Sequence, residues 1–186
     1  SNCQHIETAL PPERPKLPGS RYTLAFDIQV ALNKFQWHLP LSRQVKIART
    51  AGLTVTTQTL WGRTWAVARL LEPTWAALRT RVLDQPVVGA DETRWRLLDG
   101  KRAKPSVIAL TSDAGSYYTI ADDKSAETIG AVLGDFAGWL VADCASNYAA
   151  VYDYRRELHE QAPERAPPPF RMGACWAHAR RYFIKA

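Results

Sequence analysis

Two short apolar runs in the chain each end on an aspartate, and the two aspartates lie 52 positions apart. The first run begins at Val87 and ends on Asp91, and the second begins at Gly138 and ends on Asp143. Continuous apolar runs of this length predict strands that are buried on both faces. Because a buried carboxylate without a partner is costly, an aspartate at the end of such a strand usually binds something. Two such carboxylates, on strands about 4.8 Å apart, suit a pair of divalent ions and metal-dependent phosphoryl transfer on nucleic acid.

Length and composition predict a folded protein without a membrane partner. The 186 residues suffice for one large domain or two small ones, and 46% hydrophobic residues with seven tryptophans can fill a core. No apolar stretch approaches the roughly 20 residues of a membrane span, and no signal peptide precedes the first predicted helix. Three widely spaced cysteines do not form a disulfide framework, so we expect a reducing, cytoplasmic location.

The positive charge is concentrated in the first half of the chain. Residues 1–85 hold 11 Lys and Arg against 5 Asp and Glu, a net charge of +6, whereas residues 86–186 hold 13 of each. This asymmetry is typical of a segment that meets a polyanion such as DNA. A solvated basic face is the alternative interpretation.

The first half is predicted to be helical after an extended, Pro-rich arm over residues 1–20. Residues 21–85 predict a helix over 21–37, a second over 41–51 that ends at Gly52, and a long third helix to about residue 83, interrupted or kinked near Pro73. The second and third helices resemble a helix-turn-helix, with an ordinary helical hairpin as the alternative. The apolar positions of the first helix are Leu24, Ile28, Ala31, Leu32 and Phe35. The residues predicted to bind DNA phosphates here are Arg43, Lys46, Arg49 and Arg63.

The second half, residues 86–186, predicts alternating strands and helices. Strands are expected over 87–98, 106–111, 116–121, 139–142 and 170–175, with helices after Ser125, over 149–160, and from about residue 177. Three meandering strands followed by helix, strand, helix, strand and helix is the order of the ribonuclease H-like fold. The predicted fold class is therefore an α/β, ribonuclease H-like mixed five-stranded sheet with flanking helices, preceded by an all-α region. In that fold the first and fourth strands are parallel neighbours, which brings Asp91 beside Asp143.

Three segments of the chain resemble the transposases of bacterial insertion-sequence family 66. They are Ala90–Thr93, Leu133–Leu140 and the nine residues that begin with Cys175-Trp176-Ala177-His178. The last segment is the most specific, and a weaker similarity precedes the catalytic region, from Lys34 to Gln44.

The resemblance implies a DDE transposase, which holds two Mg²⁺ or Mn²⁺ ions with three carboxylates and cleaves and joins double-stranded DNA at transposon ends and target. Asp91 and Asp143 match the first two acids. The family favours Gly and Tyr directly after the second acid, whereas this chain continues with Cys144 and reaches Tyr148 later. The third acid of the family lies beyond residue 186, so a fragment truncated before it is expected. Cys3 and His5 are interpreted as a remnant of a zinc site, and self-association on DNA is expected.

Several other residues near these motifs have two interpretations. Glu92 either supports the metal ligands or faces solvent. Cys175 and His178 either form half a zinc site or place a buried thiol and a histidine that faces the catalytic cleft. Arg180 and Arg181 open a helix, where they bind phosphate or remain solvated. The tryptophans of the long third helix are interpreted as core or interdomain packing: Trp61, Trp65 and Trp75.

Three functions remain open at this point. The first is a transposase that cleaves DNA and transfers the strand, although the fragment alone is expected to be inactive. The second is a non-catalytic DNA-binding regulator with a degenerate ribonuclease H-like domain. The third is a structure-selective nuclease on the same fold.

Overall fold

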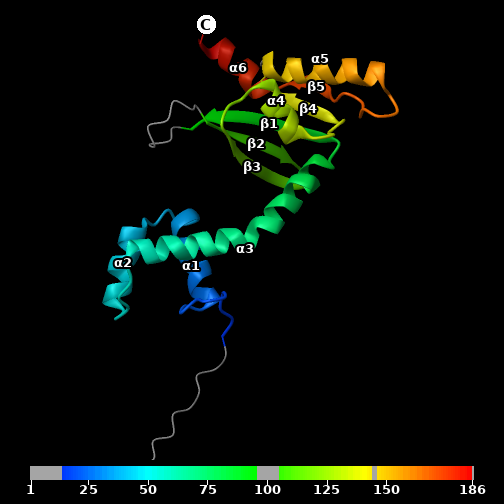
Figure 1. The fold of residues 1–186 in the computed structure, drawn as a ribbon. Coiled ribbons are helices and arrows are strands. Elements are labelled where there is room, and N and C mark those ends of the chain that lie inside the picture. The colour runs from blue at the N-terminus through cyan, green and yellow to red at the C-terminus, as the bar shows by residue number, and fades with distance from the viewer. Residues whose placement is uncertain (1–13, 96–104, 144–145, 186) are drawn as a thin grey trace, which may run out of the picture. The chain divides into compact units, whose positions relative to one another are not determined.

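The computed structural model of the protein describes residues 14–95, 105–143 and 146–185 (Figure 1). The chain divides into two compact units, Ser1–Pro73 and Thr74–Ala186, with the boundary inside the longest helix. The features expected at Cys3 and His5, over most of the Pro-rich arm and over residues 96–98 lie outside the described residues. No helix in the described part of the chain has the length and apolar character that crossing a bilayer requires.

Three helices follow the arm: α1 (Leu24–Phe35), α2 (Leu41–Thr50) and α3 (Thr57–Leu83). Two of them begin at a threonine whose hydroxyl accepts a hydrogen bond from the first turn: Thr23 from the Phe26 N–H, and Thr56 from the Thr59 N–H. Helix α2 is followed by Gly52, which has a φ of 78° and closes the helix as predicted. Helix α3 continues through Pro73, so the helix is not interrupted there, and a kink at this proline stays a prediction.

The buried face of α1 differs from the predicted one. Ile28, Leu32 and Phe35 are between 40% and 63% exposed, whereas Val30 packs with Val55 and Leu60. Helix α1 carries apolar residues on more than one side, so their spacing alone did not select the side that meets its neighbours. Two tryptophans of α3 are exposed and so do not belong to a core, while the alternative of interdomain packing stays a prediction for both: Trp61 and Trp65.

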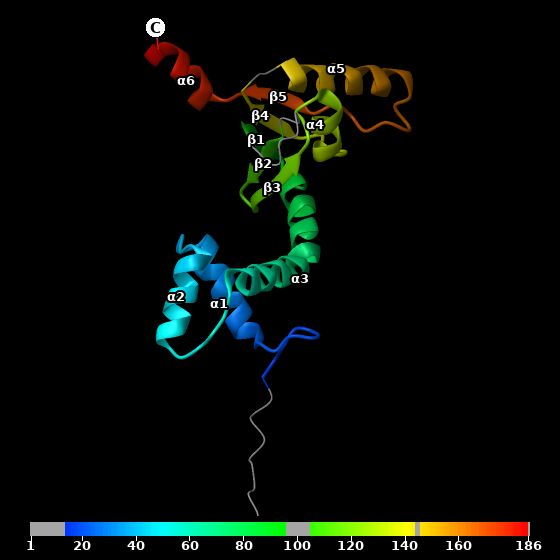
Figure 2. The same cartoon turned by 60° about the vertical axis from the view of Figure 1, so that its left-hand side comes forward.

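The second unit contains a mixed five-stranded sheet (Figure 2). Its strands are β1 (Val87–Arg94), β2 (Ser106–Ser112), β3 (Gly115–Ala121), β4 (Trp139–Ala142) and β5 (Arg171–Ala174). They lie in the order β3-β2-β1-β4-β5, with β2 antiparallel to both β1 and β3, and β4 parallel to both β1 and β5. The predicted parallel pairing of the first and fourth strands is therefore confirmed.

Helices α4 (Ala126–Leu133) and α5 (Ser146–Gln161) pack on one face of the sheet, and α6 (Trp176–Lys185) follows β5. Ile129 and Leu133 of α4 join Tyr148 of α5 in a core with the inward side chains of the strands, among them Val88 and Leu140. Side chains alternate between the faces of a strand, so the neighbours Val87 and Trp139 lie on the opposite face, where both are exposed.

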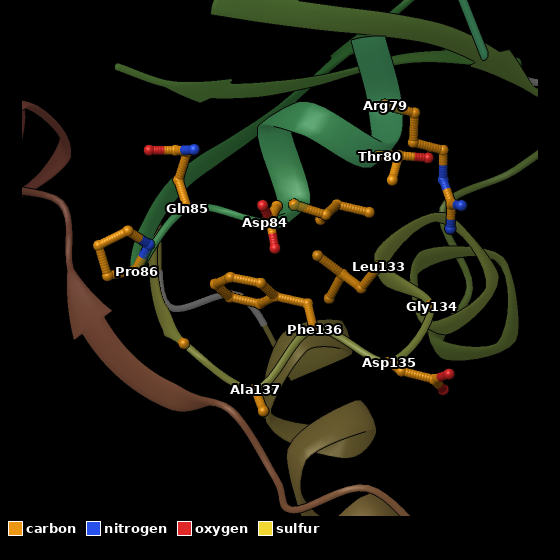
Figure 3. Close-up of a pocket in the computed structure, with 12 residues that line it drawn as sticks. Arg79, Thr80, Asp84, Gln85, Pro86, Leu133, Gly134, Asp135, Phe136 and Ala137 are labelled. Atoms are coloured by element: carbon orange, nitrogen blue, oxygen red, sulfur yellow. The ribbon is translucent and has the colours of Figure 1, made fainter. Parts of the chain in front are cut away.

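Two arginines hold the connection from α4 to β4. Arg79 donates to the carbonyl oxygens of Ala131 and Val132, which closes the end of α4. It lies beside Gly134, whose φ of 53° suits glycine and whose Cα leaves room for the guanidinium (Figure 3). Arg155 of α5 bonds the same connection from the other side, through the carbonyl oxygens of Gly134 and Phe136. The connection also lines a shallow pocket of about 510 Å³, into which Leu133 and Phe136 point (Figure 3).

Candidate functional site

Asp91 and Asp143 occupy equivalent positions on adjacent parallel strands. The register of β1 with β4 pairs Gly89 with Val141, and continuing it by two residues sets Asp91 opposite Asp143. Neighbouring strands lie about 4.8 Å apart, so the two carboxylates emerge close together. Both residues are exposed, which leaves their oxygens accessible to a cation or to solvent.

The tyrosine Tyr148, in the first turns of α5, is surrounded by three acids. Burial raises the pKa of its hydroxyl, and a hydrogen bond to Glu92 and the charges of Glu92, Asp143 and Asp91 raise it further. The phenol therefore stays protonated and acts as a donor.

Glu92 follows Asp91 directly, but its environment is different. The Glu92 side chain is 5% exposed, against 58% for Asp91, because consecutive side chains of a strand point to opposite faces. Its Oε2 accepts from the Tyr148 hydroxyl at 2.7 Å, and its Oε1 accepts from Asn147 Nδ2 at 3.1 Å. The Lys124 ammonium lies 3.7 Å from Oε1 and balances the charge.

His178 brings helix α6 to the same end of the sheet. Its Nε2 lies 3.7 Å from Asp91 Oδ1, while its Nδ1 is buried without a hydrogen-bond partner in the described structure. Cys175 is a free, half-buried thiol between β5 and α6, and its backbone N–H donates to the Ala142 carbonyl at 2.8 Å. Hydrogen bonding from His178, first from its backbone, lowers the pKa of the Cys175 thiol.

The predicted DNA-binding residues lie in different settings. Arg43, Lys46 and Arg49 are exposed along α2, and Arg180 and Arg181 are exposed on α6.

Arg63, by contrast, faces into its own unit. Its Nη1 donates to Ser20 Oγ at 2.8 Å and lies 3.8 Å from the carboxylate of the fully buried Asp27. Burial raises the pKa of Asp27, and the Arg63 charge counteracts part of that effect.

Within the described residues, no group of three or more His, Cys, Asp or Glu side chains could hold a metal ion. The exposed carboxylates of Asp91 and Asp143 are the groups here that could offer hard oxygen donors to a divalent ion.

Three residues that hold Glu92 were not predicted from the sequence: Lys124, Asn147 and Tyr148. Only Tyr148 carried a signal, because the resemblance implied a tyrosine after the second acid. Asn147 and Lys124 carried none, since their role depends on contacts with a residue 55 and 32 positions away, respectively.

A sequence model described as the Transposase IS66 family matches residues 19–186. The chain belongs to this family. The match includes both aspartates, the connection held by the two arginines, and the segment from Cys175 onward. The resemblance stated from the sequence motifs is therefore confirmed.

One relative from Sinorhizobium fredii is described as the uncharacterized protein y4jD. It is 30% identical to this IS66-family chain over 196 residues, an alignment that covers 98% of the chain. The chain spans about 37% of the length of that relative.

Proposed function

We propose that the chain is part of a DDE-type transposase, which cleaves DNA at the ends of an insertion sequence and transfers the cut strand to target DNA. The observation that carries the proposal is the matched position of Asp91 and Asp143 on adjacent parallel strands. Membership of the IS66 family and the strand order, which is that of a ribonuclease H-like fold, support it.

The proposed cofactor is a pair of Mg²⁺ or Mn²⁺ ions, for which Asp91 and Asp143 would provide ligands. Hard carboxylate oxygens are the donors that both ions prefer. When bound, the ions supply charge stabilisation for the attacking and leaving oxygens of phosphoryl transfer. His178, 3.7 Å from Asp91, holds that carboxylate from the side of α6 and supports its orientation.

The proposed partner is double-stranded DNA, as transposon end and as target. Residues 21–85 are proposed to bind it after an arm over residues 1–20, and residues 86–186 to form the catalytic core. Phosphates would be bound by Arg43, Lys46 and Arg49 of α2, by Arg63, and by Arg180 and Arg181 of α6. Such binding neutralises phosphates and releases counterions, so it depends on salt. We also propose that the protein self-associates on DNA and that it acts at the bacterial chromosome in the cytoplasm.

Two carboxylates leave the second ion short of a hard ligand, so we expect poor cleavage by the 186 residues alone. The decisive experiment compares a full-length parent protein with its Asp91→Asn and Asp143→Asn variants on DNA that carries transposon ends. Both variants should bind DNA as the parent does but lose cleavage and strand transfer with Mg²⁺ or Mn²⁺. Cleavage without strand transfer would instead indicate a nuclease.

A DNA-binding regulator is the second candidate, favoured by the exposed basic side chains of α2: Arg43, Lys46 and Arg49. A parent protein that binds DNA but never cleaves it, with or without the two aspartates, would establish that alternative and overturn the proposed reaction.

A further inference from the structure

We propose that Glu92 is a positioning residue that fastens the start of helix α5 to the strand of Asp91, and that it is not itself a metal ligand. This inference rests on the proposed function, because it concerns how the two aspartates are held. It assigns different roles to two consecutive acids of the Ala90–Thr93 motif: Asp91 to the ion and Glu92 to the scaffold.

The first observation is the direction of the two side chains. Asp91 and Glu92 are consecutive in β1, so they point to opposite faces of the sheet. Asp91 lies on the face with Asp143, whereas Glu92 lies on the face packed by α5. A single ion bound to Asp91 and Asp143 is therefore not reached by Glu92 from the same side.

The second observation is that both oxygens of Glu92 already have partners. Tyr148 donates to Oε2, while Asn147 donates to Oε1 and Lys124 lies beside it. A carboxylate that is 5% exposed is stabilised by such donors and by the nearby ammonium charge. A cation would have to displace these partners, so the site of Glu92 favours a structural role.

The third observation is where the donors come from. Helix α5 begins at Ser146, three residues after Asp143, and both Asn147 and Tyr148 lie in its first turn. Asn147 also donates to the Lys124 carbonyl at 3.2 Å, which ties in the segment that follows β3. The Glu92 contacts therefore connect β1 to the helix that begins where the Asp143 strand ends. They therefore add a second link between the two strands to the short pairing of β1 with β4.

The test is a double-mutant cycle on the 186-residue chain, with Mn²⁺ affinity measured by electron paramagnetic resonance. Glu92→Gln and Tyr148→Phe should each weaken Mn²⁺ binding by about tenfold, the effect expected of groups that orient ligands. Both substitutions remove the same link, so their effects should not add. The double variant should bind Mn²⁺ about as tightly as the single variant that has the lower affinity. Tyr152→Phe is the matched control, since its ring packs on Phe170 away from Glu92, and it should leave the affinity unchanged.

Two results would overturn the inference. In the first, Tyr148→Phe leaves the Mn²⁺ affinity unchanged, while Glu92→Gln abolishes Mn²⁺ binding as completely as Asp91→Asn does. Glu92 would then be a metal ligand. In the second, neither Glu92→Gln nor Tyr148→Phe changes the Mn²⁺ affinity. The contacts of Glu92 with α5 would then have no effect on the residues that bind the ion.

A second measurement keeps the inference separate from the proposed function. In the metal-free chain, Glu92→Gln and Tyr148→Phe should speed amide hydrogen exchange at the start of α5, whereas Asp91→Asn should not. If exchange there is unchanged in both variants, the link does not hold α5 and the inference fails. If exchange responds as expected but Asp91→Asn does not affect Mn²⁺ binding, the proposed metal site fails while the link between β1 and α5 remains.

Discussion

Arg155 Nη1 donates a hydrogen bond of 2.9 Å to the carbonyl oxygen of Phe136, and through it helix α5 holds the connection that leads into β4. The guanidinium is 8% exposed and also bonds the carbonyl oxygens of Gly134 and Gly130. One side chain thus bonds three carbonyl oxygens, two of which lie in the connection. The position of β4, and with it Asp143, depends on this buried cation.

Arg155→Met should destabilise the second unit by about 2–4 kcal/mol, because it leaves buried carbonyl oxygens without donors. Arg156→Met is the matched control: the neighbouring Arg156 is exposed and lies on the surface of α5, where it pairs with Asp153 and Glu160 and covers the Tyr152 ring. That change should cost less than about 0.5 kcal/mol. Urea unfolding of both variants measures the difference, and equal losses would contradict the role given to Arg155.

Gly138→Ala should also destabilise the second unit, by about 1–3 kcal/mol, through overpacking. A Cβ at this position would lie 2.6 Å from the Pro86 carbonyl oxygen and 2.8 Å from the Phe136 ring. Gly62→Ala is the control, because a Cβ there meets nothing within 4 Å and lies within helix α3. Alanine is the better helix former, so that variant should gain up to about 1 kcal/mol. If Gly138→Ala leaves the stability in thermal unfolding unchanged, the backbone around residue 138 can shift to accommodate the added Cβ, which would contradict the prediction.

The pH dependence of stability should depend on Asp27. Because its folded pKa lies above the ordinary value of 3.8, folding takes up a proton, and stability falls as pH rises from about 3.8 through the folded pKa. Asp27→Asn removes this loss, so the variant should become more stable relative to wild type as pH increases from 4 to 7. Urea unfolding at several pH values tests this, with exposed Asp153→Asn as control. Wild-type and Asp27→Asn curves that run parallel would contradict it.

DNA binding through α2 should show in its dependence on salt. Replacing Arg43, Lys46 and Arg49 by alanine, one at a time, should each reduce the slope of log affinity against log salt by about 0.9. Binding to duplex DNA between 50 and 200 mM salt gives the slope, and Arg156→Ala on α5 serves as a control on the other unit. A slope that none of the α2 variants changes would remove α2 from the proposed interface.

The sequence predicted the sheet well because strong local signals define its strands. The apolar run from Trp139 to Ala142 forms β4 with the predicted bounds, and Ser125 caps α4 through the Thr128 N–H. The 52-residue interval already indicated the paired aspartates. Prediction was weaker where tertiary contacts decide: the predicted helix over 149–160 omits the first turn of α5, which holds polar Asn147, whose side chain donates to Glu92.

The first unit illustrates the same limit. Its helices were predicted from caps and a proline. The face that α1 buries was not predicted, because Asp27 is fully buried beside Arg63 while the apolar Phe35 is exposed. A buried ion pair between residues 36 positions apart has no signature in a local pattern. The roles of the DNA-binding arginines and of both aspartates remain predictions.

The pairing of β1 with β4 also determines where relatives of this chain can gain or lose residues. Residues inserted between Arg94 and Ser106, the last positions that pair β1 with β2, would lengthen the interval between the acids without shifting either strand. A single residue inserted between Gly89 and Asp91 would instead turn the carboxylate to the opposite face. The number of residues between the two acids can therefore change in evolution. The two-residue spacings from Gly89 to Asp91 and from Val141 to Asp143 cannot, because they set the direction of each carboxylate.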